Sequence, residues 1–70
     1  MDLPQILGRN VRDLRRSKGL SQEQLALETD MKRSYVSDLE RGTRNPSVKA
    51  IERLAKSLGV EPWTLLKPGG

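Results

Sequence analysis

The absence of cysteine from a chain of 70 residues limits how this protein can be stabilised. A chain of this length has room for one domain and buries only about 60% of the surface that its unfolded form exposes. Without cysteine, neither disulfide bonds nor thiolate metal sites can supplement that small core. We therefore expect a single domain whose stability depends on economical packing of helices.

Histidine is also absent from the sequence. Histidine is the most frequent general base in enzymes and the most common nitrogen ligand of metal ions. The aspartate and glutamate residues that remain form no convergent catalytic cluster in the sequence. We therefore expect no enzymatic activity, no metal site, no cofactor and no small-molecule ligand.

The charged residues are unevenly distributed along the chain. The 13 lysines and arginines outweigh 9 acidic residues, which gives a net charge of +4. Residues 1–20 and 41–70 are net basic, whereas residues 21–40 are net acidic. This balance favours a nucleic acid as partner, with an anionic membrane surface as the weaker alternative. Alternatively, the charged residues could form the solvated surface of the helices without binding either partner.

No segment of about 20 apolar residues is present that could span a bilayer, and the N-terminus lacks the pattern of a secretory signal. These features predict a cytoplasmic protein without a membrane partner. Residues 67–70 (KPGG) are expected to be a flexible C-terminal end or the cut edge of a longer chain.

Apolar residues recur at helical spacing along most of the chain. Leu3, Leu7, Val11 and Leu14 share one helical face, and Gly19 follows them as a stop signal. No strand-like alternation extends beyond three residues, so the predicted fold class is all-α. The expected helices span residues 3–18, 21–29 (with a Ser21/Gln24 capping box), 33–41, 47–58 and 62–66.

The helices expected at 21–29 and 33–41 are separated by a three-residue turn, which is the arrangement of a helix-turn-helix. The runs GLSQEQLA (19–26), SDLERG (37–42) and NPS (45–47) resemble the phage repressor and Cro family of DNA-binding domains. Within that family, the stretch 34–45 is similar to the controller proteins of restriction-modification systems. The resemblance implies a compact five-helix repressor-type domain over residues 1–66.

The resemblance also implies that the helix at 33–41 enters the major groove and reads bases through Arg33, Ser34, Ser37 and Asp38. Arginine can donate two parallel hydrogen bonds to guanine, and serine can pair with several base edges. Asp38 could accept only from an amino group of cytosine or adenine. The alternative is that Asp38 holds Arg33 or Arg41 in place.

Gln22 matches a family glutamine that contacts a phosphate and an outer base, although it could simply be a polar residue at a helix start. Tyr35 could cover the core with its ring, donate its hydroxyl to a phosphate, or do both. The residues expected to contact the sugar-phosphate backbone are Lys32, Tyr35, Arg41, Thr43, Arg44, Asn45 and Lys49.

Arg15 and Glu40 occupy positions that the family uses for an ion pair between the first and third helices. We expect Glu40 to be partly buried, so its carboxylate needs a partner. Two residues depart from the family pattern. Asp30 replaces a glycine in the turn, and Lys32 replaces the residue that usually caps the recognition helix.

These features predict a sequence-specific regulator of transcription that binds double-stranded DNA. One recognition helix reads only about four to six base pairs, so we expect a homodimer on a palindromic operator. Trp63, Leu65 and Leu66 are candidates for the dimer interface, and packing into the core is the alternative. Two other functions remain open, namely an antitoxin-like protein-interaction module and the DNA-targeting domain of a longer regulator.

Overall fold

The computed structural model describes residues 2–68, and within that range all regular structure is helical. Its four α-helices are α1 (Leu3–Ser17), α2 (Gln22–Thr29), α3 (Arg33–Glu40) and α4 (Val48–Leu58). A 3-10 helix, η1 (Pro62–Leu66), follows near the C-terminus. The predicted all-α class is confirmed, and each helix begins and ends within one residue of its predicted bounds.

The expectation of five α-helices is wrong for the last segment, which is a 3-10 helix. At its start, the Thr64 amide donates to the carbonyl of Glu61, the residue before η1, at 2.9 Å, which is the shorter-range bond of a 3-10 turn. A segment of five residues that begins with proline can close few of the longer-range bonds of an α-helix. The flexible end expected at 67–70 includes residues 69 and 70, which lie outside the described residues.

The residues that precede the helices explain where two of the helices begin. Ser21 and Gln24 form the predicted capping box, because the Gln24 amide donates to Ser21 Oγ at 3.0 Å and the Ser21 amide donates to Gln24 Oε1 at 2.8 Å. A second capping box joins Asp2 to Gln5 at the start of α1. In contrast, Lys32, which precedes the first residue of α3, forms no side-chain capping bond within the described residues.

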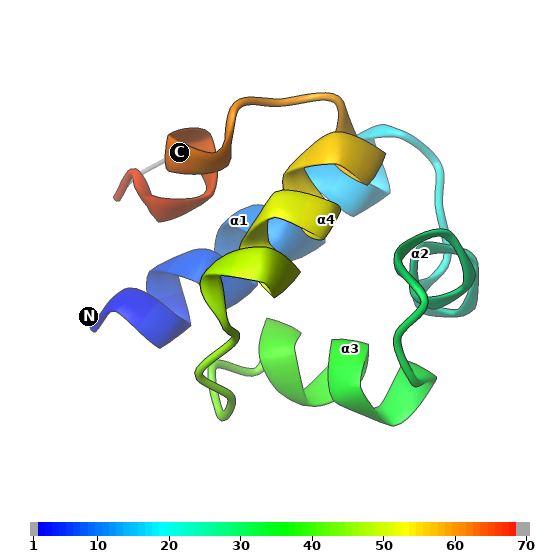
Figure 1. The fold of residues 1–70 in the computed structure, drawn as a ribbon, viewed down its shortest axis with the longest axis horizontal. Helices are drawn as coiled ribbons and strands as arrows, with labels where there is room; N and C mark the ends of the chain where they lie inside the picture. Colours follow the sequence, from blue (N-terminus) through cyan, green and yellow to red (C-terminus); the bar gives the residue numbers. More distant parts are fainter. Residues whose placement is uncertain (1, 69–70) are drawn as a thin grey trace.

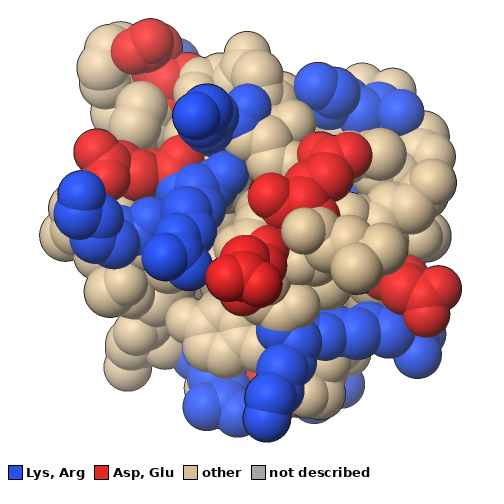
Figure 2. Space-filling view, turned by 45° about the vertical axis from the view of Figure 1, so that its right-hand side comes forward, with Lys and Arg blue, Asp and Glu red and all other residues tan. Residues whose placement is uncertain are grey.

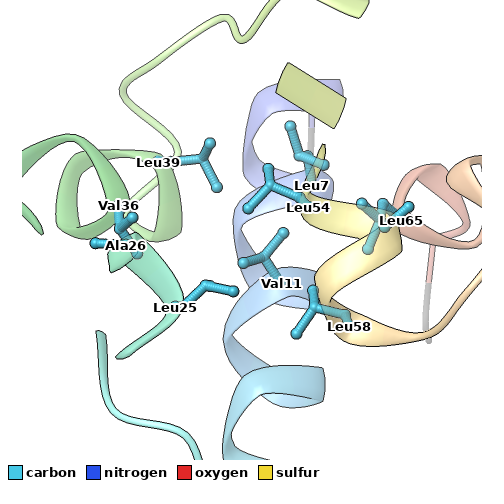
Figure 3. Packing of buried hydrophobic residues seen from close by; sticks show 10 residues of the cluster. Leu7, Val11, Leu25, Ala26, Val36, Leu39, Leu54, Leu58 and Leu65 are labelled. Carbon is cyan, nitrogen blue, oxygen red and sulfur yellow. The ribbon is translucent and has the colours of Figure 1, made fainter. Parts of the chain in front are cut away.

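Helices α1 and α4 lie side by side at the centre of the molecule, with α2 and α3 on one side and η1 on the other (Figure 1). The core fills the space between these elements. Figure 3 shows Leu25 and Leu39 pointing from α2 and α3 toward Val11 of α1, while Leu65 approaches from the opposite side. Each such buried aliphatic side chain contributes about 1.5–3 kcal/mol to the free energy of unfolding.

The position of η1 corrects one expectation about the dimer interface. Leu65 is completely buried in the core, so it is unavailable to a partner chain. Its place is fixed by Asn10, a buried residue of α1 whose side-chain amide donates to the carbonyls of Leu65 at 2.8 Å and Lys67 at 2.9 Å. These bonds connect the C-terminal segment to α1.

Gly8 allows α1 to approach the end of α3 closely. A Cβ atom at this position would lie 2.3 Å from the Leu39 carbonyl oxygen and 2.8 Å from that of Glu40. Both distances are far shorter than ordinary van der Waals contact, and both neighbours are backbone atoms that cannot rotate away. The close packing of α1 against α3 therefore requires glycine at this position.

We predict that Gly8→Ala lowers the free energy of unfolding by about 2–3 kcal/mol, because the helices must separate to accept the methyl group. In an ordinary helix the same change would stabilise the protein by about 1 kcal/mol. Urea denaturation of the purified domain measures the difference. Gly19→Ala is the matched control, because its Cβ would meet nothing and only the cost of a left-handed backbone, about 1–2 kcal/mol, would remain. A stabilising effect of Gly8→Ala would contradict the packing.

Candidate nucleic-acid interface

The turn between α2 and α3 has the geometry of a helix-turn-helix. Asp30 ends α2 in the left-handed conformation, with φ 57° and ψ 42°. Aspartate tolerates this conformation better than most residues other than glycine. The turn is closed by the Met31 amide, which donates to the Ala26 carbonyl at 2.9 Å. The replacement of glycine by Asp30 therefore leaves the turn intact.

Helix α3 has one face in the core and one face in solvent. Val36 and Leu39 are buried against the neighbouring helices. On the other side, Arg33 and Ser34 are exposed, whereas Ser37, Asp38 and Tyr35 are partly exposed. The residues expected to read bases on α3 therefore share the surface that is open to a partner.

Basic residues frame this open surface. Four of them are exposed at its edges: Lys32, Arg33, Arg41 and Arg44. Figure 2 shows basic side chains along the lower edge of the molecule, where α3 lies in Figure 1, and acidic side chains across the middle, over α2. The exposed acidic residues of α2 therefore lie beside the basic surface, whereas Asp38 of α3 lies within it.

Asp38 lies among the basic residues at the end of α3. Its carboxylate forms ion pairs with Arg41 and, at 3.4 Å, with Arg44. Within the described residues it forms no ion pair with Arg33, which was one of its two expected partners. Its backbone carbonyl accepts from both the amide and the hydroxyl of Thr43, at 3.1 and 3.0 Å. Asp38 thus organises the segment that follows α3.

The ring of Tyr35 lies beneath the guanidinium of Arg44, with 5.4 Å between the guanidinium carbon and the ring centroid. This distance is within the range of a cation–π contact. Tyr35 also packs against the hydrophobic core. It therefore connects the core to an arginine that is exposed beside α3.

The buried partner of Arg15 is Glu40, the last residue of α3. Arg15 Nε and Nη2 donate to the two carboxylate oxygens at 2.6 and 3.1 Å, and Arg15 Nη1 donates to the Leu20 carbonyl at 2.8 Å. Both side chains are less than one-tenth exposed. The hydrogen bond to Glu40 raises the pKa of Arg15 above its ordinary value, against the opposing effect of burial. The pair joins α1 to the last residue of α3.

Gln22, at the start of α2, also contacts this pair, which the sequence did not predict. Its side-chain amide donates to Glu40 Oε1 at 3.1 Å. The two residues are 18 positions apart, so no local spacing rule could have indicated the contact. One N–H and the carbonyl oxygen of the Gln22 amide remain for other partners.

The remaining predicted site residues lie in two different regions. Thr43 and Asn45 are exposed in the loop after α3, and Lys49 is exposed in the first turn of α4, where it pairs with Glu52 at 3.5 Å. Trp63 and Leu66 lie on η1, which is separated from α3 by the central helices (Figure 1). Because of this separation, the two candidate dimer contacts do not belong to the α3 surface. Trp63 is 64% exposed and Leu66 is half-buried.

Two other features, a metal site and a membrane-spanning helix, would require clustered acidic side chains and a long apolar helix. Within residues 2–68, no group of three acidic side chains is placed to hold a metal ion. Every helix in that range is too short or too polar to traverse a bilayer.

The matching protein-family model is described as helix-turn-helix, and it covers residues 11–62. The chain therefore belongs to the helix-turn-helix family. Control protein C.BamHI of Bacillus amyloliquefaciens is 53% identical over 62 residues, which are 87% of this chain and 76% of that protein. The immunity repressor of Bacillus phage phi105 is 36% identical over 55 residues, which are 79% of this chain and 38% of the repressor.

Two solved structures extend the similarity to the fold. The restriction-modification controller protein C.AhdI from Aeromonas hydrophila is 47% identical, with a TM-score of 0.85 over 89% of this chain and 94% of that chain. The controller protein C.Esp1396I, solved as a tetramer with its natural operator, is 31% identical, with a TM-score of 0.82 over 93% of this chain and 86% of that chain. The predicted resemblance to repressors and controller proteins is confirmed.

We predict that Arg15→Ala lowers the free energy of unfolding by about 3–5 kcal/mol, because the buried Glu40 carboxylate loses its charged partner. Thermal or urea unfolding of the free domain measures the effect. Arg15→Met keeps the aliphatic part of the side chain, so it separates lost packing from lost charge. The control is Arg16→Ala, an exposed neighbour on α1, which should change stability by less than about 0.5 kcal/mol. An equally small effect of Arg15→Ala would mean that Glu40 is solvated.

Proposed function

We propose that this protein is a sequence-specific regulator of transcription that binds double-stranded DNA through α3. The observation that carries the proposal is the open face of α3, which is framed by Lys32, Arg33, Arg41 and Arg44. An α-helix fits the major groove, and basic residues at its edges neutralise the adjacent phosphates. The operator complex of the similar controller protein C.Esp1396I supports the proposal.

The proposed roles divide into base reading and backbone contact. Bases are read by Gln22, Arg33, Ser34, Ser37 and Asp38. The sugar-phosphate backbone is contacted by Lys32, Tyr35, Arg41, Thr43, Arg44, Asn45 and Lys49. Contacts of the second kind position the domain on DNA without reading its sequence.

We further propose that the protein acts as a homodimer on a palindromic operator in the cytoplasm, without enzymatic activity. One helix contacts too few base pairs to select a unique site, so two recognition helices are needed. The exposed Trp63 and the half-buried Leu66 on η1 remain the candidate contacts between the two copies. The tetramer that C.Esp1396I forms on its operator supports assembly of such domains on DNA.

The proposal predicts strong salt dependence of binding to duplex DNA. A dimer that contacts about six to ten phosphates should give a slope between roughly −5 and −9 in a plot of log affinity against log salt concentration. Fluorescence anisotropy with a labelled duplex, repeated at several salt concentrations, measures the slope. A slope near zero, or no duplex binding at low salt, would contradict DNA binding and favour a protein partner.

Arg33 and Arg44 should have different effects on sequence preference. We predict that Arg33→Ala costs about 1–3 kcal/mol on the preferred site and relaxes the preference at one base position. Arg44→Ala should weaken binding to all sequences nearly equally and reduce the salt slope by about 1. Selection from random duplexes with each variant gives the base preferences. If neither variant changes them, α3 does not lie in the groove as proposed.

A further inference from the structure

Asp38 places a negative charge within the basic surface of α3. One carboxylate oxygen faces Arg41 and the other faces Arg44. The side chain of Asp38 is 26% exposed, whereas those of Arg41 and Arg44 are 64% and 52% exposed. The carboxylate therefore cancels one of two positive charges at the place where DNA phosphates would approach.

The backbone keeps Asp38 close to these arginines. Its carbonyl accepts two hydrogen bonds from Thr43, which precedes Arg44 in the loop after α3. Arg41 is also held by Ser37, whose hydroxyl oxygen accepts from Arg41 Nη1 at 3.3 Å. The loop and the helix end thus form one hydrogen-bonded unit, so Arg41 and Arg44 are presented to DNA together with the Asp38 carboxylate.

We propose that Asp38 determines specificity by weakening the binding of non-operator DNA more than the binding of the operator. This inference rests on the proposed function. On any duplex, phosphates must compete with Asp38 for Arg41 and Arg44, and they repel its carboxylate. An operator that places a cytosine or adenine amino group opposite Asp38 compensates for this cost, because a carboxylate can accept more than two hydrogen bonds.

The direct test is Asp38→Asn, which keeps the size of the side chain and removes its charge. The affinity for the selected operator and for a scrambled duplex of the same length is measured by anisotropy. We expect scrambled-duplex binding to become about five- to tenfold tighter and its salt slope to steepen by about 1, as for one additional phosphate contact. The affinity for the operator should not increase. The ratio of operator affinity to scrambled-duplex affinity should therefore fall by at least about five- to tenfold.

Two further variants separate the charge of Asp38 from the added amide and from net charge. Asp38→Ala removes the same charge without adding an amide donor, and it should lower the affinity ratio in the same direction. Glu61→Gln makes the same change in net charge at an exposed residue directly before η1, and the central helices separate η1 from α3 (Figure 1). It should change both affinities by less than about twofold and leave their ratio unchanged. A thermal melt of each variant shows that it is folded.

The inference and the proposed function fail in different ways. If the wild-type protein does not prefer any duplex sequence, the proposed function is wrong and the inference falls with it. If the wild-type protein discriminates but the Asp38 variants keep the same affinity ratio, or behave like Glu61→Gln, only the inference is wrong.

Discussion

The ion pair between Arg15 and Glu40 is the interaction on which the shape of the proposed DNA-binding surface depends. Helix α3 has only eight residues and lacks a side-chain cap at its start, so it would not be stable alone. Arg15 fixes its last residue to α1, and Gly8, two turns earlier on α1, lets the two backbones meet. Both buried charges are compensated only while the helices stay in this arrangement.

The ion pair between Arg15 and Glu40 also connects the core to the surface. Glu40 accepts from Gln22 at the start of α2, so one carboxylate joins α1, α2 and α3. On the solvent side of α3, the Asp38 carboxylate likewise joins two residues, because it forms ion pairs with both Arg41 and Arg44. A buried acidic residue thus orients the recognition helix, and a second acidic residue, two positions earlier, orients the arginines beside it. The two residues differ in exposure, because Glu40 is buried and Asp38 lies on the surface that we propose contacts DNA.

The sequence predicted the parts of this structure that follow local rules. Helical spacing and caps such as Ser21 located the helices, because the apolar period and the capping bonds lie within one or two turns. The contact of Gln22 with Glu40 and the close approach at Gly8 could not be predicted this way, because each depends on how distant segments pack. Leu65 shows the same limit, since an apolar residue near the C-terminus fits a core and an interface equally well until the fold is known.

In the proposed complex, two copies of this domain place α3 in successive major grooves on one face of DNA. Footprinting on an operator selected from random duplexes tests this arrangement. We expect two protected half-sites related by two-fold symmetry, with their centres about one helical turn, roughly 34–36 Å, apart. A single protected half-site, or two half-sites in the same orientation, would contradict the symmetric dimer. Failure to enrich any sequence would contradict sequence-specific binding by α3.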